Sequence, residues 1–262
     1  MKKLLGIALV GATLVSGMAQ AKDWSTIRVG IEAAYPPFNE LTPDKQIVGF
    51  DKDMADAVCS YMKAKCTFVI QDWDGMIPAL MSRRFDTIIS SMASTDERKQ
   101  KIAFTRAYYN TPAFFLIKKG AKLNVDSPAA MKGKRIGAQS ATIHQNYVNE
   151  FYQKAGAEVT AYQSLDQAYM DLTAGRLDAV LSGSLEHETF LKSKDGAGFA
   201  MAGKPLLDPK WFGEGAAIAV RKDDEDLRKR LDDAVLALHK NGTYDKIRKK
   251  YFSYDIWPKS AQ

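Results

Sequence analysis

The chain has 262 residues, a formal net charge of +6, two cysteines and three histidines. Because the two cysteines and the scattered histidines form no cluster of metal ligands, we expect neither a zinc site nor another cofactor. The basic residues are interleaved with acids along expected helical faces such as 228–230 and 248–250, without a nucleic-acid-binding motif, so the charge does not indicate a nucleic-acid partner.

The first 21 residues have the pattern of a secretory signal peptide. Met1-Lys2-Lys3 precedes an apolar run from Leu4 to Val15, and Ala19-Gln20-Ala21 has the small-x-small form of a cleavage site. The apolar run is too short for a stable membrane span, and no later stretch approaches the length that a span needs. We therefore expect cleavage after residue 21, export, and a soluble mature protein without a lipid anchor, since no cysteine follows the cleavage site.

The two cysteines, Cys59 and Cys66, are separated by six residues. In an exported chain this pair is expected to form a disulfide that links a helix end to the next strand and stabilises by roughly 2–3 kcal/mol on the chain-entropy model. Two reduced structural cysteines are the alternative if the chain is not exported.

The segment 85–98 has the pattern of a buried strand that ends in hydroxyls and leads into a helix capped by Thr95. Asp96 and Glu97 suit the positive end of that helix, whereas Arg98 beside them is disfavoured unless it meets an anion. Its guanidinium could hold a ligand carboxylate through two parallel bonds, and further donors could come from Ser90, Ser91 and Ser94. Pairing of Arg98 with a neighbouring acid is an equally good interpretation of the segment alone.

Two pairs of segments repeat in spacing. Asp74–Ser90 matches Asp166–Ser182, each a helix followed by a buried strand, and Arg28-Val29-Gly30 matches Arg135-Ile136-Gly137, each a short strand that opens into a loop and a helix. Together they predict two α/β lobes of similar plan, each a mostly parallel sheet flanked by helices.

The C-terminal part returns to a strand at Gly215–Val220 and to an amphipathic helix capped by Asp223 or Asp224. The buried stripe of this helix is predicted to be Leu227, Leu231, Ala234, Val235 and Leu238. Asn241-Gly242 ends it, and a final short helix carries Tyr244, Ile247 and Tyr251. The chain is expected to cross between lobes at Tyr109–Pro112 and around Lys204–Leu206, which gives one lobe of residues 22–110 and 206–262 and a second of 111–205.

By these patterns the mature chain resembles the periplasmic amino-acid-binding proteins of ABC importers, especially the lysine/arginine/ornithine and histidine receptors and their opine-binding relatives. The resemblance rests on seven segments in order, which are Tyr35–Phe38, Gly49–Asp53, Trp73–Pro78, Ser90–Arg98, Leu172–Asp178, Arg221–Asp224 and Asn241–Lys246. It implies a monomeric, two-lobed periplasmic-binding-protein type II fold that closes on its ligand about a hinge and delivers it to an inner-membrane permease.

Carried over by position, the resemblance makes Arg98 the clamp on the ligand α-carboxylate, helped by Ser91 and, from the second lobe, by Thr142 and the backbone of Ile143. Thr142 as a plain helix cap is the alternative. The full predicted ligand-binding set is Glu32, Tyr35, Trp73, Ser90, Ser91, Met92, Arg98, Thr142, Ile143, His144 and Gly183.

Three of these residues are expected to receive the ligand side chain. Tyr35 and Trp73 resemble the aromatic walls that hold an aliphatic or guanidinium group in relatives, although core packing is the usual role of such residues. Glu32 stands where receptors for basic amino acids carry an acid, which favours a cationic ligand; a surface salt bridge is the alternative. We interpret Asp51 as a helix cap, and His187 and His239 as ordinary polar helix residues.

Two positions depart from the basic-amino-acid receptors. Ala93 replaces a ligand-binding serine, and Gly183 stands where those receptors place an aspartate that holds the ligand α-ammonium. Opine receptors also lack that acid, so Gly183 predicts room for an N-substituent, unless Glu186 supplies the missing charge.

We therefore expect a receptor for arginine, ornithine or lysine, or for an N-substituted relative such as an opine. The first alternative is an enzyme on the same scaffold, similar to periplasmic cyclohexadienyl dehydratases, with Glu32 as its cleft acid. The second is a sensory domain, although such domains are usually fused to a membrane span.

Overall fold

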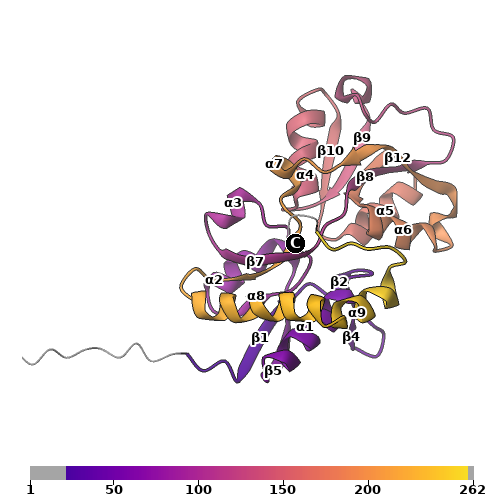
Figure 1. The fold of residues 1–262 in the computed structure, drawn as a ribbon. Helices are drawn as coiled ribbons and strands as arrows, with labels where there is room; N and C mark the ends of the chain where they lie inside the picture. Colours follow the sequence, from indigo (N-terminus) through magenta and orange to yellow (C-terminus); the bar gives the residue numbers. More distant parts are fainter. Residues whose placement is uncertain (1–21, 259–262) are drawn as a thin grey trace, which may run out of the picture.

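The computed structural model describes residues 22–258, which form two lobes, each built on a five-stranded sheet (Figure 1). The predicted signal peptide lies outside the described residues. The first sheet has the order β5 (Lys65–Ile70), β1 (Thr26–Ile31), β6 (Thr87–Ile88), β13 (Ala216–Val220), β7 (Ala103–Tyr109). The second has the order β10 (Glu158–Tyr162), β9 (Arg135–Gln139), β11 (Ala179–Gly183), β8 (Ala113–Lys118), β12 (Phe199–Leu206).

Both sheets are mostly parallel, as predicted. In the first sheet β1 pairs in parallel with β5 and β6, and only β13 runs against its neighbours. In the second, β9 pairs in parallel with β10 and β11, and only β8 runs against its neighbours. A small antiparallel sheet of β2 (Ala34–Tyr35), β3 (Asn39–Leu41) and β4 (Ile47–Val48) follows β1.

Helices cover both sheets. The first lobe carries α1 (Phe50–Tyr61), α2 (Met76–Met81), α3 (Asp96–Lys99), α8 (Glu225–Lys240), α9 (Thr243–Tyr251) and the 3₁₀ turn η1 (Trp73–Gly75). The second carries α4 (Ile143–Tyr147), the π-helical turn η3 (Val148–Gln153), α5 (Leu165–Thr173), α6 (Ser184–Leu191), α7 (Pro209–Phe212) and the 3₁₀ turns η2 (Pro128–Met131) and η4 (Asp195–Gly198). Among these helices none is both long and apolar enough to cross a membrane.

The predicted amphipathic helix is α8, which lies across the first lobe (Figure 1). Its N-cap is Asp224, and all five residues of the predicted stripe are buried. They share one core cluster with Val29, Phe50 and Tyr244, so the stripe attaches the C-terminal part of the chain to the N-terminal strands.

The repeat seen in the sequence has a structural reason. Arg28 of β1 forms three hydrogen bonds with Asp86, through its backbone N–H and its guanidinium, at 2.7–3.0 Å. Arg135 of β9 bonds Asp178 through the same groups at 2.8–3.2 Å. One Arg–Asp pair in each lobe thus fastens the start of the central strand, β6 or β11, to the neighbouring parallel strand, β1 or β9.

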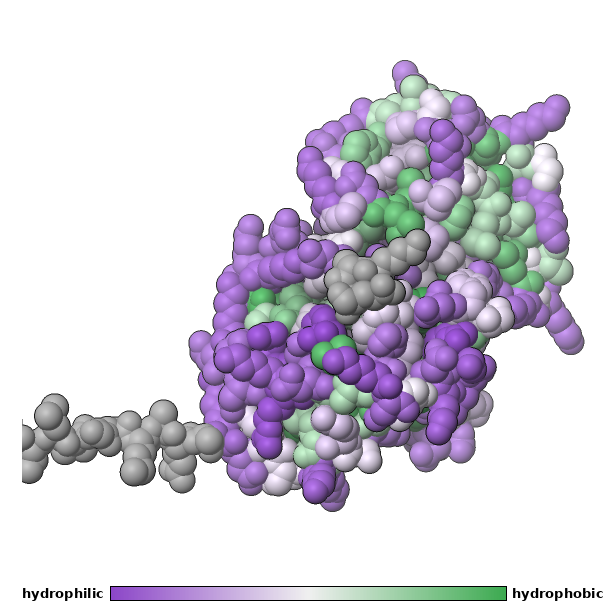
Figure 2. All heavy atoms as spheres, in the orientation of Figure 1, coloured by the Kyte–Doolittle hydropathy of each residue, from purple (hydrophilic) through white to green (hydrophobic). Residues whose placement is uncertain are grey.

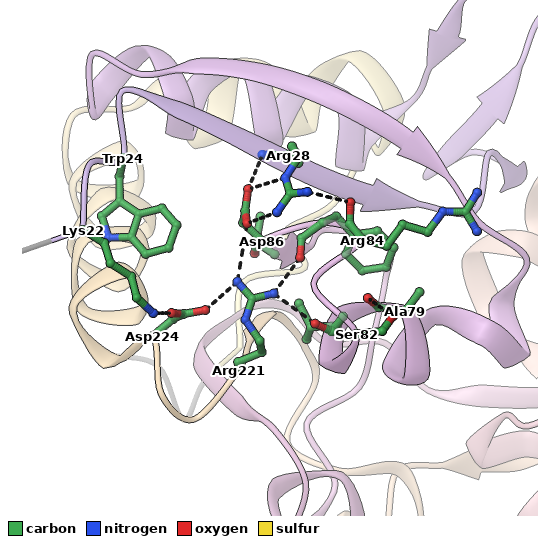
Figure 3. Close-up of polar contacts among 12 residues, drawn as sticks. Lys22, Trp24, Arg28, Ala79, Ser82, Arg84, Asp86, Arg221 and Asp224 are labelled. Atoms are coloured by element: carbon green, nitrogen blue, oxygen red, sulfur yellow. Dashed lines mark hydrogen bonds and ion pairs between the residues drawn. The ribbon is translucent and has the colours of Figure 1, made fainter.

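In the first lobe this pair belongs to a larger network. The Arg221 guanidinium lies between Asp86 and Asp224, at 3.4 and 2.6 Å, and Asp224 also pairs with Lys22 (Figure 3). Arg221 donates further to the carbonyls of Leu80 and Phe85. Buried charges that are paired in this way fix the start of α8 against β1 and β6.

The chain passes between the lobes twice, from β7 to β8 over 110–112 and from β12 to β13 over 207–215. In the second passage α7 packs against α4, with Phe212 buried in the core of the second lobe. After α9 the segment 252–258 returns to the first passage, where the Ile256 carbonyl accepts from the Asn110 N–H at 2.9 Å. The Tyr254 hydroxyl donates to Glu188 of α6, so this segment contacts both lobes.

Three local expectations differ from the structure. The predicted strand at 85–90 is paired on both sides only over Thr87–Ile88, because the chain turns away at Ser91, whose φ is 56°. Asp51 is not a helix cap: Gly49 is the N-cap of α1, and the buried Asp51 carboxylate accepts instead from side chains of Asn39, Ser91 and Tyr108. His187 is fully buried, between the Tyr169 hydroxyl and the Phe114 carbonyl.

The predicted disulfide is present and joins α1 to β5 through Cys59 and Cys66.

In the orientation of Figure 1, hydrophilic residues cover most of the first lobe, whereas hydrophobic residues are more numerous on the second (Figure 2). The exposed hydrophobic side chains of the second lobe include Met170, which is 65% exposed, and Phe151.

Candidate functional site

Residues of both lobes line a cavity of about 320 Å³. Its lining is Glu32, Tyr35, Trp73, Ser91, Ala93, Arg98, Gln139, Thr142, Ile143 and His144. Most of these residues follow the carboxyl ends of parallel strands, where the sheets of open α/β folds place ligands. The structure therefore brings together eight residues of the predicted set.

Arg98 lies in the short helix α3, whose N-cap Thr95 accepts from the Arg98 backbone N–H as predicted. Its guanidinium donates to the Ala93 carbonyl at 3.0 Å and, across the cavity, to the Ala141 carbonyl at 3.3 Å. No carboxylate within residues 22–258 forms an ion pair with it, so the alternative that it serves a neighbouring acid is not what the structure has. Burial lowers the pKa of Arg98 to about 10, which keeps it charged at neutral pH.

The second lobe faces Arg98 with the turn that precedes α4. Ala141 adopts φ 56°, and Thr142 is the N-cap of α4, accepting from the Gln145 N–H. The Thr142 hydroxyl donates to the Gln139 carbonyl at 2.6 Å. Thr142 thus is a helix cap, as its alternative interpretation held, and it also lines the cavity.

Two aromatic side chains flank the cavity. The Trp73 indole N–H donates to the Ala141 carbonyl at 3.1 Å, and the Arg98 guanidinium carbon lies 5.3 Å from the centre of the Trp73 ring. The Tyr35 hydroxyl lies 3.3 Å from the Ser182 hydroxyl of β11. Trp73 and Tyr35, which belong to the first lobe, therefore both contact the second lobe.

Glu32 is buried at the end of β1 and makes no ion pair in the described part of the chain, which contradicts the alternative of a surface salt bridge. Its carboxylate accepts from the Gln139 side-chain amide at 2.5 Å. Burial raises the pKa of Glu32 to about 7, and the charges of Asp72, Asp166 and Asp51 act in the same direction. A carboxylate in such surroundings favours a cation in the cavity.

Two predicted residues, Ser90 and Met92, lie behind the cavity rather than in its lining. The Ser90 hydroxyl accepts from the Glu32 backbone N–H at 3.0 Å, and Met92 is buried in a core cluster with Phe85 and Ile88. Between them, Ser91 reaches the lining and donates to the Asp51 carboxylate at 2.8 Å.

A second cavity of about 420 Å³ adjoins the first. Gly183 lies there rather than in the first cavity, together with Glu186, Asn110, Thr111 and Phe212. Both cavities share the lining residues Tyr35, Ser91, Ala93, Ile143 and His144. Burial lowers the pKa of His144 to about 3, so its imidazole is neutral at physiological pH.

Gln139 lines the cavity but is not in the predicted ligand-binding set, although the sequence repeat indicates its position. Arg28 and Arg135 occupy equivalent positions, and Glu32 and Gln139 each follow four residues later. Equivalent strand ends in the two lobes thus face each other across the cavity. Asn110 and Thr111 carry no such signal, because the first passage between the lobes has no counterpart in the repeat.

Comparison with protein families matches residues 27–254 to the bacterial extracellular solute-binding proteins, family 3. The L-arginine-binding protein of Pseudomonas aeruginosa is 47% identical over 98% of this chain and 99% of its own. The lysine/arginine/ornithine-binding periplasmic protein of Escherichia coli is 37% identical over 98% of both chains. Among solved structures, an ancestral arginine-binding protein bound to arginine matches with a TM-score of 0.81 and 34% identity, over 87% of this chain and 99% of that one.

Proposed function

Since the chain belongs to family 3 of the bacterial extracellular solute-binding proteins and is an amino-acid-binding protein rather than an enzyme, we propose that its ligand is a basic amino acid. Arginine, ornithine and lysine are the first candidates, and N-substituted derivatives such as opines are the second. The observation that carries the proposal is the buried Glu32 carboxylate, which has no cationic partner among residues 22–258 and faces the same cavity as Arg98.

Arg98 holds the ligand α-carboxylate. It is the one arginine in the lining of these two adjoining cavities, and its guanidinium is bonded only to neutral carbonyls. The backbone N–H of Ile143, at the start of α4, supplies a further donor from the second lobe, and the Ser91 hydroxyl supplies one from the first lobe if it exchanges its bond to Asp51 for one to the ligand. A carboxylate held by both lobes at once favours the closed arrangement over the open one.

The ligand side chain lies between Tyr35 and Trp73, with its cationic end at Glu32. The aromatic faces contact the aliphatic part and attract the positive charge. Gln139 donates to Glu32 from the opposite lobe, and a guanidinium or ammonium in the cavity would replace or supplement that bond. This arrangement favours cationic over neutral amino acids, because a neutral side chain leaves the buried carboxylate uncompensated.

Delivery of the ligand to the membrane depends on closure of the two lobes around it. We assign residues 22–110 and the chain from β13 onward to one lobe, and residues 111–206 together with α7 to the other, with an inner-membrane ABC permease reading the closed, ligand-bound surface. The protein acts as a monomer in the periplasm, after removal of residues 1–21. These assignments rest on the family and on the two passages of the chain between the sheets.

Thermal stabilisation of the mature protein tests the proposal. The panel contains arginine, ornithine, lysine, N2-substituted arginines, glutamine and prephenate, the last as a probe for the dehydratase alternative. A ligand that binds only the folded state stabilises by about 2.7 kcal/mol at a hundredfold excess over its Kd. We expect stabilisation by cationic members only, and stabilisation by glutamine or prephenate alone would refute the proposal.

Glu32→Gln is the matched variant for this panel, because it keeps the shape of the side chain and can still bond Gln139. It is expected to lose most of the preference for cationic over neutral ligands. A variant with unchanged preference would show that Glu32 does not face the ligand cation.

A further inference from the structure

Glu186 is a buried acid in the second cavity that nothing in the preceding function uses. It lies in the first turn of α6, is 4% exposed and lines the cavity. Its Oε2 atom is buried without a hydrogen-bond partner among residues 22–258. A buried carboxylate oxygen without a partner is costly, so this atom is placed to receive a donor that enters the cavity.

Gly183 makes room for this carboxylate. Its φ of −68° and ψ of 156° are open to any residue, so the backbone does not require glycine there. A Cβ atom at position 183 would instead lie 2.3 Å from Glu186 Oε2 and 3.0 Å from its carboxyl carbon. The Glu186 carboxylate therefore occupies the space that a side chain at 183 would take, and the two positions act as one unit.

The surroundings of Glu186 offer it no positive charge. The titratable groups that act on it or respond to it are the hydroxyls of Tyr35, Tyr109, Tyr169 and Tyr254 and the acids Asp51 and Glu188. Burial raises the pKa of Glu186 to about 7, and the charges of Asp51 and Glu188 act in the same direction. A cation in the cavity is the group that would hold Glu186 ionised.

The charges of the joined cavities select a ligand class. Their described lining contains two carboxylates without a cation, Glu32 and Glu186, and one guanidinium without an acid, Arg98. The complementary molecule carries two cations and one carboxylate, as free arginine, lysine and ornithine do. An opine adds a second carboxylate, for which this lining holds no further cation.

We propose that Glu186 binds the α-ammonium of the ligand and that the site is therefore specific for free basic amino acids. The proposal rests on the proposed function, since it takes the ligand carboxylate to lie at Arg98. Tyr35, Ser91 and Ile143 line both cavities, so a group attached to the α-carbon of a ligand held at Arg98 is directed toward Glu186. Glu186 thus sets specificity from one helical turn beyond position 183.

Calorimetric titration of the mature protein tests this with three ligands: arginine, 5-guanidinopentanoate, which lacks the α-amine, and N2-(1-carboxyethyl)arginine. The wild type is expected to bind arginine at least about 30-fold more tightly than either analogue, the ratio typical of an unpaired buried charge. Glu186→Gln is expected to lose a similar factor for arginine and to bind arginine and 5-guanidinopentanoate with nearly equal affinity. Glu150→Gln removes a surface acid of the second lobe that pairs with Lys154, and it should match the wild type.

A relocation of the carboxylate keeps the test decisive if the single variant folds poorly. Glu186→Ala should lose arginine binding, and the double variant Gly183→Asp with Glu186→Ala should regain it, because the alanine vacates the space that a Cβ at 183 needs. Retention of arginine affinity within threefold in Glu186→Gln, or tighter binding of the carboxyethyl derivative by the wild type, would overturn the inference. A wild type that binds none of the three ligands would instead refute the proposed function itself.

Discussion

Arg98 and Glu32 are held in the same cavity without direct contact, each bonded to a neutral group of the opposite lobe. Arg98 donates to the Ala141 carbonyl, and Glu32 accepts from the Gln139 amide. Each bond satisfies one part of a charged group and leaves its charge uncompensated. The two residues thus mark the two ends of a ligand that carries a carboxylate at one end and a cation at the other.

Replacement of Arg98 should separate binding from folding. Arg98→Ala is expected to weaken arginine binding at least about 100-fold, because a bidentate charged pair is lost, while the unfolding midpoint changes by only a few degrees. Calorimetry and thermal unfolding measure the two effects. Arg98→Lys keeps the charge without the planar fork and should give an intermediate affinity. Binding by Arg98→Ala within tenfold of the wild type would place the carboxylate elsewhere.

Glu32 makes the stability of the ligand-free protein depend on pH. Its pKa is about 7 in the folded protein and 4.5 as a free group, so the folded state binds the proton more tightly. Stability from this group is therefore full below pH 4.5 and is lost as the pH rises toward 7. Relative to the wild type, Glu32→Gln should gain stability between pH 5 and 8, on the order of 2–3 kcal/mol. Denaturant unfolding at several pH values measures it, and a constant difference would contradict the assignment.

Some of these site residues could be predicted from the sequence and others could not. Arg98 could be found because a guanidinium in the first turn of a helix conflicts with the helix dipole, a conflict that is visible in one segment. Gln139 and the contact of Glu186 with Gly183 depend on packing between strands and helices, which periodicity does not encode. The resemblance predicts Met92 in the site, but its side chain lies in the core, because alternate residues after a strand point to opposite sides.

At the scale of elements, the site is built on two turns that each follow a strand and precede a short helix. Ser91 and Ala141 both adopt φ 56° in these turns. Residues with a Cβ atom adopt this conformation at a cost of about 1 kcal/mol, which the surrounding contacts must offset.

Ala141 allows that cost to be measured. Ala141→Gly should leave stability unchanged or raise it by up to about 1 kcal/mol, because glycine adopts a positive φ freely but also gains freedom in the unfolded chain. Ala141→Val should lower it by more than 1 kcal/mol, since a β-branched side chain is strained there. Denaturant unfolding compares the two, and equal stabilities would contradict the left-handed turn.

The disulfide gives a second prediction at this scale. The Cys59→Ser, Cys66→Ser variant should unfold with a free energy lower by about 2–3 kcal/mol, because the closed loop between the cysteines is short. Ligand affinity should stay unchanged, since the bond joins α1 to β5 and neither cysteine lines the cavities. Reduction of the wild type should reproduce the loss of stability, and a loss of affinity would indicate an unexpected link to the site.

The helix α8 and the strands of the repeat could be predicted because long periodic patterns and repeated Arg–Asp spacing are local properties. The two-residue strand β6 and the buried role of Asp51 could not, because both follow from tertiary partners, β13 for one and Tyr108 for the other. The order of the strands also required the structure, since β13 inserts between β6 and β7 from far along the chain.

At the scale of the molecule, hydrogen bonds at the rim hold the lobes together beside the cavity. The Gln163 amide donates to the Asp72 carboxylate at 2.9 Å, and both residues are exposed. Such a bond contributes little to folding of either lobe, but separation of the lobes would break it, so under the proposed hinge closure it favours the closed arrangement.

Gln163→Ala should therefore lower ligand affinity two- to fivefold without a change in the unfolding midpoint of the ligand-free protein. The faster dissociation of the ligand, followed by stopped-flow, should account for most of the effect. Gln153→Ala is the control, because Gln153 is an exposed residue of the second lobe whose side chain makes no hydrogen bond in residues 22–258. An equal loss in both variants would show that the rim bond is not specific to closure.

The contact of Trp73 with the opposite lobe has a spectroscopic consequence. Of the four tryptophans, Trp24 bonds Asp226 within the first lobe, Trp211 packs on Tyr147 in the second, and Trp257 stacks on His239. Within residues 22–258 only the Trp73 indole bonds the backbone of the other lobe, so its surroundings would change in the proposed opening of the lobes. The chain thus carries its own fluorophore at the cleft, and its emission should report occupancy without any attached dye.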